Sequence, residues 1–224
     1  MGGYSFKNFK DYLFLRMGAN EAWLNYYPLW INSAYRALCT KDKLWQIKHR
    51  LFIPELETDA AINTSVGQGY ITTPTDALSV REIYDGTSNT RLDWMSWADY
   101  IGYTNRADSA AYAKPQSWHR RGSKIYIYPT PDATYALSVY YKKRVADLSG
   151  DSDVTVIGAE WDDVILELAH YFARVWNNEY DKAKFSKDAA TEMIAGIMTT
   201  YGQEEMARRE QIKPNILMTM KQTY

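Results

Sequence analysis

The chain has 224 residues, of which 46% are apolar, and a formal net charge of −1, which fits one large or two small domains with a real core. The near-neutral charge excludes a global field that would draw the protein onto nucleic acid or an anionic membrane, and no apolar run approaches the ~18 residues of a membrane span. The only cysteine, Cys39, excludes an intramolecular disulfide and fits a reducing compartment.

Two helices are predicted near the N-terminus. The opening stretch MGGYSFKNFK lacks the apolar region of a secretory signal. Residues 5–17 then place apolar side chains at helical spacing, with Ser5 as N-cap and Gly18 as C-cap. A second helix is predicted over 27–39, because Pro28 suits a first turn and an apolar stripe follows it.

A β region is predicted over residues 43–148. WQIKHRLFI alternates from Trp45 and predicts a strand, and GQGYITTPTDALSVREIY predicts two strands around a Pro-Thr-Asp turn. Asp85–Gly86 is a hairpin signal, and SWADYIG predicts a helical turn. The run KIYIYPTPDATYALSVYYKK, residues 124–143, alternates, turns and alternates again, which predicts a hairpin. We therefore expect a small antiparallel sandwich or barrel.

The predicted hairpin has two unlike faces. We expect one face to close the β core, and it carries Ile125, Ile127, Tyr135, Leu137 and Val139. The opposite face carries Tyr126, Tyr128 and Tyr140. Tyrosine is enriched at protein interfaces, so this second face either meets another protein or belongs to a sheet buried on both sides.

Helical periodicity returns after the β region. Trp161 to Trp176 follows the i, i+3, i+4, i+7 spacing closely, and a second helix is predicted from about residue 181. The fold class expected is α+β: a bundle of two N-terminal helices (1–42) and two C-terminal helices (149–209), with the β region (43–148) inserted between them. An extended C-terminal arm, residues 210–224, completes the chain.

No catalytic, metal or cofactor site is expected. His49, His119 and His170 lack a second ligand at metal-binding spacing. Residues 151–162 begin like a calcium loop, but Val156 stands where glycine is required, so a solvated loop is favoured. Scattered carboxylates such as Glu160 leave a hydrolase with a dispersed site as a remote alternative.

The order of charges indicates a protein partner. Residues 114–144 are basic, with Asp132 as the only acid, whereas residues 147–167 are acidic without any lysine or arginine. Opposite patches of this kind orient subunits that dock on one another. Contact between the basic hairpin and nucleic-acid phosphates is the alternative.

Four stretches, taken in order, resemble a known family. SFKNFKDYLFLRMG followed by WINSAYRALC is similar to its opening helices, and YITTPTDALSVREIY to its strand, turn and strand. PQSWHRRGSKIYIYPTPDATYALSVYYKKRVADLSGDSD resembles its most typical run, and EWDDVILELAHYFA its following helix. The family is that of the head-to-tail adaptor (connector) proteins of tailed bacteriophages, in particular the adaptor rings of short-tailed phages.

The resemblance implies a structural virion protein and not an enzyme. Such proteins form a ring, usually twelve-fold, between the portal protein and tail proteins (nozzle or fibre-attachment), and DNA passes the central channel without sequence-specific binding. It implies assembly in the host cytoplasm, a place at the head–tail interface of the virion, a part in DNA ejection, no cofactor and no membrane. The competing hypothesis is a monomeric protein- or carbohydrate-binding module that uses a tyrosine-rich β face.

Two groups of interface residues follow as expectations. We expect a subunit or tail interface at Tyr126, Tyr128, Tyr140, Lys142, Lys143 and Arg144. We expect the C-terminal arm to project from about Gln211 and to order on the portal or an adjacent subunit through Ile212, Pro214, Ile216, Leu217, Met218 and Met220.

Overall fold

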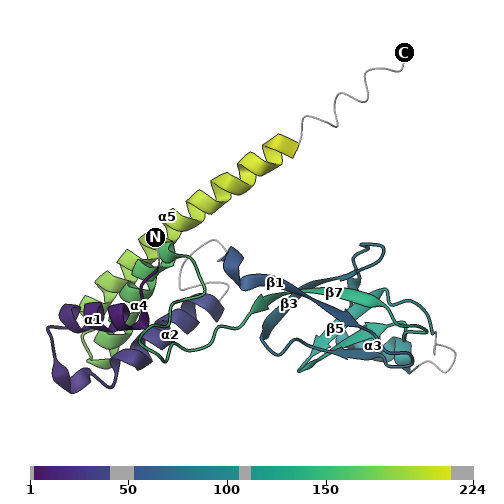
Figure 1. Ribbon diagram of the computed structural model, residues 1–224, viewed down its shortest axis with the longest axis horizontal. Coiled ribbons are helices and arrows are strands. Elements are labelled where there is room, and N and C mark those ends of the chain that lie inside the picture. The colour runs from purple at the N-terminus through teal and green to yellow at the C-terminus, as the bar shows by residue number, and fades with distance from the viewer. Residues whose placement is uncertain (1–2, 41–52, 106–111, 213–224) are drawn as a thin grey trace, which may run out of the picture. The chain divides into compact units, whose positions relative to one another are not determined.

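The computed structural model describes residues 3–40, 53–105 and 112–212, with side chains as far as Tyr201 (Figure 1). The chain divides into two compact units. We call them the helical unit, Met1–Ile53 with Ala146–Tyr224, and the β unit, Pro54–Val145. The predicted fold class, α+β with a β region inserted between helices, is confirmed.

The helical unit contains the helices expected from the periodicity: α1 (Phe6–Arg16), α2 (Tyr27–Thr40), α4 (Asp162–Trp176) and α5 (Tyr180–Ile212). Short 3₁₀ turns, η1 (Glu21–Trp23) and η3 (Ala159–Trp161), precede α2 and α4. The N-cap Ser5 accepts a bond from the Asn8 N–H at 3.3 Å and forms a capping box with it. Gly18 takes φ of +78° directly after α1, where glycine is favoured because it lacks a Cβ.

Helix α4 is the centre of the helical unit, since α1, α2 and α5 all contact it. The first part of its apolar stripe is fully buried, including Val164, Ile165 and Leu168, and Trp161 just before it is also fully buried. On α5 the buried positions Ala183, Ala190 and Ile194 repeat at helical spacing and face α4. The last described side-chain contact of α5 joins the rings of Tyr201 and Trp161, 6.3 Å apart.

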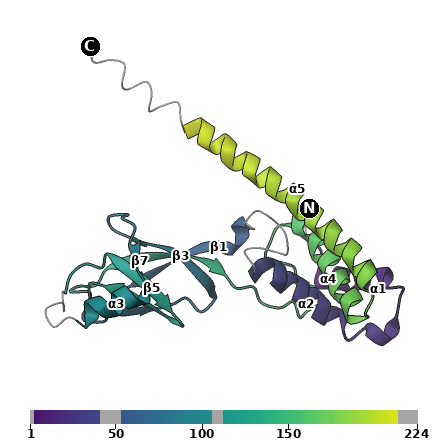
Figure 2. The same cartoon turned by 180° about the vertical axis from the view of Figure 1, so that it is seen from behind.

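Helix α5 continues past this contact to Ile212, three residues beyond the end predicted from the sequence. Figure 2 shows the yellow C-terminal part of α5 running beyond α4. None of the described helices is long and apolar enough to cross a membrane.

Two buried polar residues of α2 fasten the segment that returns from the β unit. The Asn32 side chain donates to the Leu148 carbonyl at 2.9 Å and accepts from the Leu148 N–H at 2.8 Å. The Tyr35 hydroxyl accepts from the Val156 N–H at 3.0 Å, and burial raises the pKa of Tyr35 to about 12. The two bonds of Asn32 satisfy both backbone groups of Leu148, which would otherwise be buried without partners.

The β unit consists of two sheets. One has the strand order β1 (Glu57–Asn63), β7 (Ala136–Lys143), β3 (Ala77–Asp85); the other has β2 (Tyr70–Thr72), β6 (Lys124–Tyr128), β5 (Ser117–Arg121), β4 (Asp93–Trp94). All pairs are antiparallel except β4 with β5. Helix α3 (Trp97–Thr104) and the 3₁₀ turn η2 (Pro54–Leu56) complete the unit. Both sheets contribute to a single core, which includes Ile83, Trp118, Ile125, Ile127, Leu137 and Val139.

The predicted hairpin over residues 124–143 is wrong. Both strands exist, but β6 pairs with β5 and β2, whereas β7 pairs with β1 and β3 in the other sheet. The alternation did identify the core face, because Ile125, Ile127, Leu137 and Val139 are each at most 1% exposed. These residues reach one core from two sheets, and such facing strands carry the same alternating pattern as a hairpin.

Other details of the β region also differ from the expectation. Strand β1 lies in a polar stretch where no strand was predicted. The hairpin turn at Asp85–Gly86 is confirmed, because Tyr84 and Arg91 form an antiparallel bridge across it, but the strand that follows, β4, pairs in parallel with β5. The two strands around the Pro-Thr-Asp turn, β2 and β3, are confirmed but belong to different sheets. The strand predicted from Trp45 lies largely outside the described residues.

Candidate functional site

Two of the three tyrosines expected at an interface lie against helix α3. The Tyr126 ring lies 5.0 Å from that of Trp97 and 5.3 Å from that of Tyr100, and Tyr128 stacks on Tyr103 at 5.1 Å. Helix α3 begins at this place because the N-cap Ser96 accepts from the Asp99 N–H at 3.1 Å. The second face of β6 is therefore covered largely by the chain's own aromatic helix.

Tyr140 lies on a different surface. It belongs to β7 in the other sheet, is 43% exposed, and meets the Tyr84 ring edge-on at 5.4 Å. Its neighbour across the strand pair is Asp59 of β1. The structure thus does not bring the three tyrosines together into one surface.

The basic residues expected beside these tyrosines differ in accessibility. Lys142 is only 2% exposed, whereas Arg144 is exposed and Lys143 half-buried. Arg144 also closes a loop, because its backbone N–H donates to the Asp76 carbonyl at 2.6 Å. Only Lys143 and Arg144 of this group thus present surface to a partner.

The remaining cations of the basic block have partners within the β unit. Arg121 lies over the Trp97 ring at 4.4 Å, and Lys124 over the Tyr70 ring at 3.9 Å. Arg120 donates to the Leu78 carbonyl at 2.7 Å. These contacts hold the cations over aromatic rings and strand ends, and so reduce what they offer to phosphates.

The acidic block is likewise used inside the helical unit. Asp147 pairs with Arg36 at 3.0 Å, and Asp151 with Lys10 at 2.5 Å. Asp153 accepts from the N–H groups of Ser149 and Gly150, both at 2.8 Å, and these bonds lower the pKa of Asp153. The loop that resembled a calcium site is thus closed by its own hydrogen bonds. Among the described residues, no three His, Cys, Asp or Glu side chains gather as a metal site would require.

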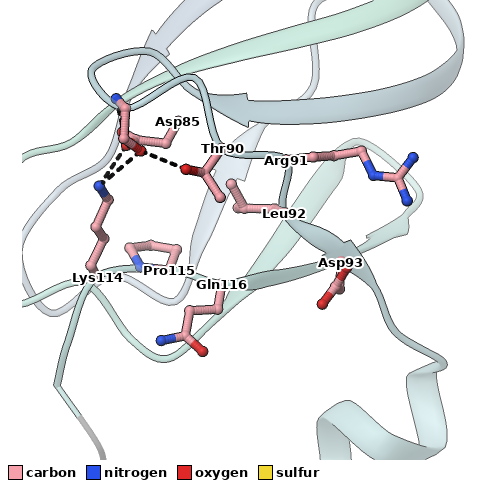
Figure 3. Close-up of a pocket in the computed structure, with 9 residues that line it drawn as sticks. Asp85, Thr90, Arg91, Leu92, Asp93, Lys114, Pro115 and Gln116 are labelled. Atoms are coloured by element: carbon pink, nitrogen blue, oxygen red, sulfur yellow. Dashed lines mark hydrogen bonds and ion pairs between the residues drawn. The ribbon is translucent and has the colours of Figure 1, made fainter. Parts of the chain in front are cut away.

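A cleft of about 310 Å³ lies beside the Asp85–Gly86 turn (Figure 3). Its floor is the Asp85 carboxylate, which is 2% exposed and accepts from Lys114 Nζ at 2.5 Å and from the Ser88 N–H at 2.9 Å. These bonds, with that to Lys114 the strongest, hold the pKa of Asp85 far below its usual range. The carboxylate is therefore committed to fastening the turn and offers no free base.

A second cleft, of about 370 Å³, lies among α1, α4 and α5. His170 lies in it between Arg174, whose Nε donates to His170 Nε2 at 3.1 Å, and Ser186, whose hydroxyl is 2.9 Å from Nδ1. Burial, and then the positive charges of Arg174 and Arg16, lower the pKa of His170 to about 4. The neutral imidazole contacts Arg174 on its own helix and Ser186 on α5, and so stabilises the packing of α4 against α5.

Exposed aromatic side chains were not identified from the sequence. Trp94 is 64% exposed at the edge of the β unit, and Trp176, which the periodicity placed with the core, is 57% exposed at the end of α4. Trp176 contacts Tyr26, itself 39% exposed, with ring centres 5.5 Å apart. Leu24 and Leu29 nearby in the chain are also about half exposed, at 53% and 49%. A position at the very end of an apolar stripe was the only signal for Trp176.

The residues expected in the portal-contacting arm are not tested. Ile212 is the last residue of α5, and nothing is described of its side chain. Pro214, Ile216, Leu217, Met218 and Met220 lie outside the described residues.

Comparison with known proteins gives one result. No curated protein matches the chain. The model of one family, described as SU10 adaptor protein, matches residues 6–214, which is nearly the whole chain and includes every helix and strand of both units. The chain therefore belongs to the SU10 adaptor protein family, and the resemblance to phage head-to-tail adaptors is confirmed.

Proposed function

We propose that this phage adaptor protein forms a ring, twelve-fold as the resemblance implies, that joins the portal to tail proteins and leaves a channel for DNA. The family match over residues 6–214 is the observation that carries this proposal. Exposed aromatic side chains on both units, such as Trp94 and Trp176, support it. Ring subunits contact their neighbours through two unlike surfaces, so each copy needs apolar surface in more than one place.

The competing hypothesis of a monomeric binding module depended on an open face of tyrosines. Trp97, Tyr100 and Tyr103 of α3 lie against Tyr126 and Tyr128, and Tyr140 lies on the other sheet. The surface that this hypothesis required is therefore divided, and no observation favours a carbohydrate ligand over a protein partner.

The direct test mixes the purified protein with its portal and images the complex by electron microscopy. A closed ring of adaptor on one end of the portal is expected, with the copy number read from its symmetry. A monomer that ignores portal at micromolar concentrations, by light scattering and in images, would contradict the proposal.

The C-terminal arm is proposed to attach this ring to the portal. Helix α5 continues to Ile212, and the residues after it include Ile216, Leu217, Met218 and Met220. Deletion of 213–224 is expected to weaken portal binding at least tenfold. A matched variant keeps the length of the arm but changes these four residues to serine. It distinguishes the contribution of their apolar side chains from that of the arm's length. Unchanged portal binding by both variants would refute a role of the arm.

A further inference from the structure

Three of the four sheet edges in the β unit are protected. β2 and β4 are very short, with the bounds Tyr70–Thr72 and Asp93–Trp94. The outer edge of β3 is covered at its end, because Leu92 N–H donates to the Ile83 carbonyl at 2.8 Å and Asp85 N–H to the Thr90 carbonyl at 2.9 Å, and the earlier part of β3 is made irregular by register shifts between Ala77/Ser79 and Val80/Glu82. Short strands and covering segments are the devices by which proteins prevent unwanted strand pairing.

Strand β1 is neither short nor covered by any segment of the described residues. It spans Glu57–Asn63, pairs only with β7 within the described residues, and keeps one register along its whole length without a bulge. Its sequence, ETDAAIN, contains no proline, glycine or lysine. A long, regular edge of this kind is a template for another strand.

The register determines which backbone groups face away from β7. Thr64 N–H donates to the Tyr135 carbonyl at 2.9 Å, and this pair continues the β1–β7 register. Hydrogen-bonded and non-hydrogen-bonded pairs alternate in an antiparallel ladder. The residues that direct their N–H and C=O groups toward the outer edge therefore include Asp59, Ala61 and Asn63.

The side chains of β1 differ between its two faces, and the exposed face carries a negative charge. Ala60 and Ile62 pack against the core, whereas Asp59, Ala61 and Asn63 are exposed on the outer face. Asp59 lies beside the exposed Tyr140, to which it is opposite in the register. A cation on an added strand opposite Asp59 gains an ion pair and lies within reach of the Tyr140 ring.

We propose that β1 takes up an extended, basic segment of a tail protein as an additional strand. This rests on the proposed function, because it names the chemistry of one adaptor partner. A second copy fits less well, because its β1, ETDAAIN, brings carboxylates and no lysine or arginine to pair with Asp59.

The test uses the isotope-labelled full chain and two probe peptides, TKVKVKT and TEVEVET, followed by NMR shifts of the β1 amides. TKVKVKT is expected to shift the amides of residues 57–63 and to bind at least tenfold more tightly than TEVEVET. Ala61→Pro removes one outward N–H while leaving the bonds to β7 intact, and is expected to weaken TKVKVKT binding at least tenfold. Ala61→Thr keeps the N–H and is the matched control with unchanged binding.

A second variant guards against misfolding of the proline variant. Asp59→Lys keeps the strand and is expected to reverse the preference, so that TEVEVET binds more tightly. Equal binding of both peptides, or binding that Ala61→Pro leaves unchanged, would overturn the proposal. If the protein instead has twice the monomer mass in solution and Ala61→Pro abolishes this dimer, the edge binds a second copy. That result would overturn the proposal of a basic partner. Because these readouts need no portal, a failure of ring formation is distinguishable from a failure of this proposal.

Discussion

The helical unit and the β unit reach their cores in different ways. In the helical unit, α4 supplies one continuous stripe, and α1, α2 and α5 pack around it, so each helix is specified mainly by its own residues. In the β unit, Ile125 and Leu137 belong to strands close in the chain that lie in opposite sheets. The comparison shows that local periodicity is sufficient for the first core, whereas the second depends on pairings between distant residues.

The largest expected effect comes from removing core side chains. Leu168→Ala in α4 and Ile125→Ala in β6 replace side chains that are fully buried, and each is expected to destabilise its own unit by about 2–5 kcal/mol. Hydrogen exchange measured separately for residues 162–176 and 117–143 checks this. If the units are independent, protection falls only in the unit that carries the substitution. An equal loss in both would show that they unfold as one.

The next effect concerns the two hydrogen bonds between the Asn32 side chain and the Leu148 backbone, which we call the polar clamp. Asn32→Ala leaves the buried Leu148 N–H and C=O without partners and is expected to cost the helical unit about 2–3 kcal/mol. Arg36→Ala, one turn further along α2, breaks only an exposed ion pair with Asp147 and is the control, with a cost of about 0–1 kcal/mol. Chemical denaturation followed by near-UV circular dichroism measures both. Equal costs would mean that the clamp contributes no more than a surface pair.

The smallest expected effect is a loss of stability at acidic pH, which sets in at a different pH in each unit. The pKa of His170 is lowered to about 4. Below pH ~6.5, His170 therefore binds a proton in the unfolded chain but stays neutral in the folded helical unit. Stability is therefore lost as pH falls from about 6.5 to 4, by about 1–2 kcal/mol after allowance for solvent screening. In the β unit the pKa of Asp85 is lowered, so its contribution is complete at neutral pH and is lost only as pH falls below the ordinary aspartate range. His170→Gln is expected to remove the pH dependence of the helical unit between about pH 6.5 and 5, above the range in which its carboxylates titrate. Hydrogen exchange at both units measures this, and an unchanged slope would refute the role of His170.

Much of the fold could be predicted from particular residues, and the failures have physical causes. Ser5, Gly18 and the stripe of α4 identified the helices because caps and periodicity act within one turn. The pairing of β6 and β7 could not be predicted, because Ile125, Ile127, Leu137 and Val139 alternate alike in a hairpin and in two facing sheets. Strand β1 was missed because only Ala60 and Ile62 of its residues pack against the core.

The candidate surfaces were harder to predict than the fold. Tyrosines on the second face of β6 suggested an interface, but Trp97, Tyr100 and Tyr103 fold back over them. Lys142 looked accessible from its place in a basic run, and yet it is buried. Exposure depends on what the rest of the chain covers, and a residue's own neighbours in sequence do not carry that information.

The β unit is joined to the helical unit at two places, Ile53–Pro54 and Val145–Ala146. A single proteolytic cut at either place divides the chain into two fragments, but the β unit stays covalently attached to one part of the helical unit through the other connection, so release of the β unit requires two independent cleavages. For a phage adaptor protein, a doubled connection of this kind tolerates one broken peptide bond without loss of the inserted unit.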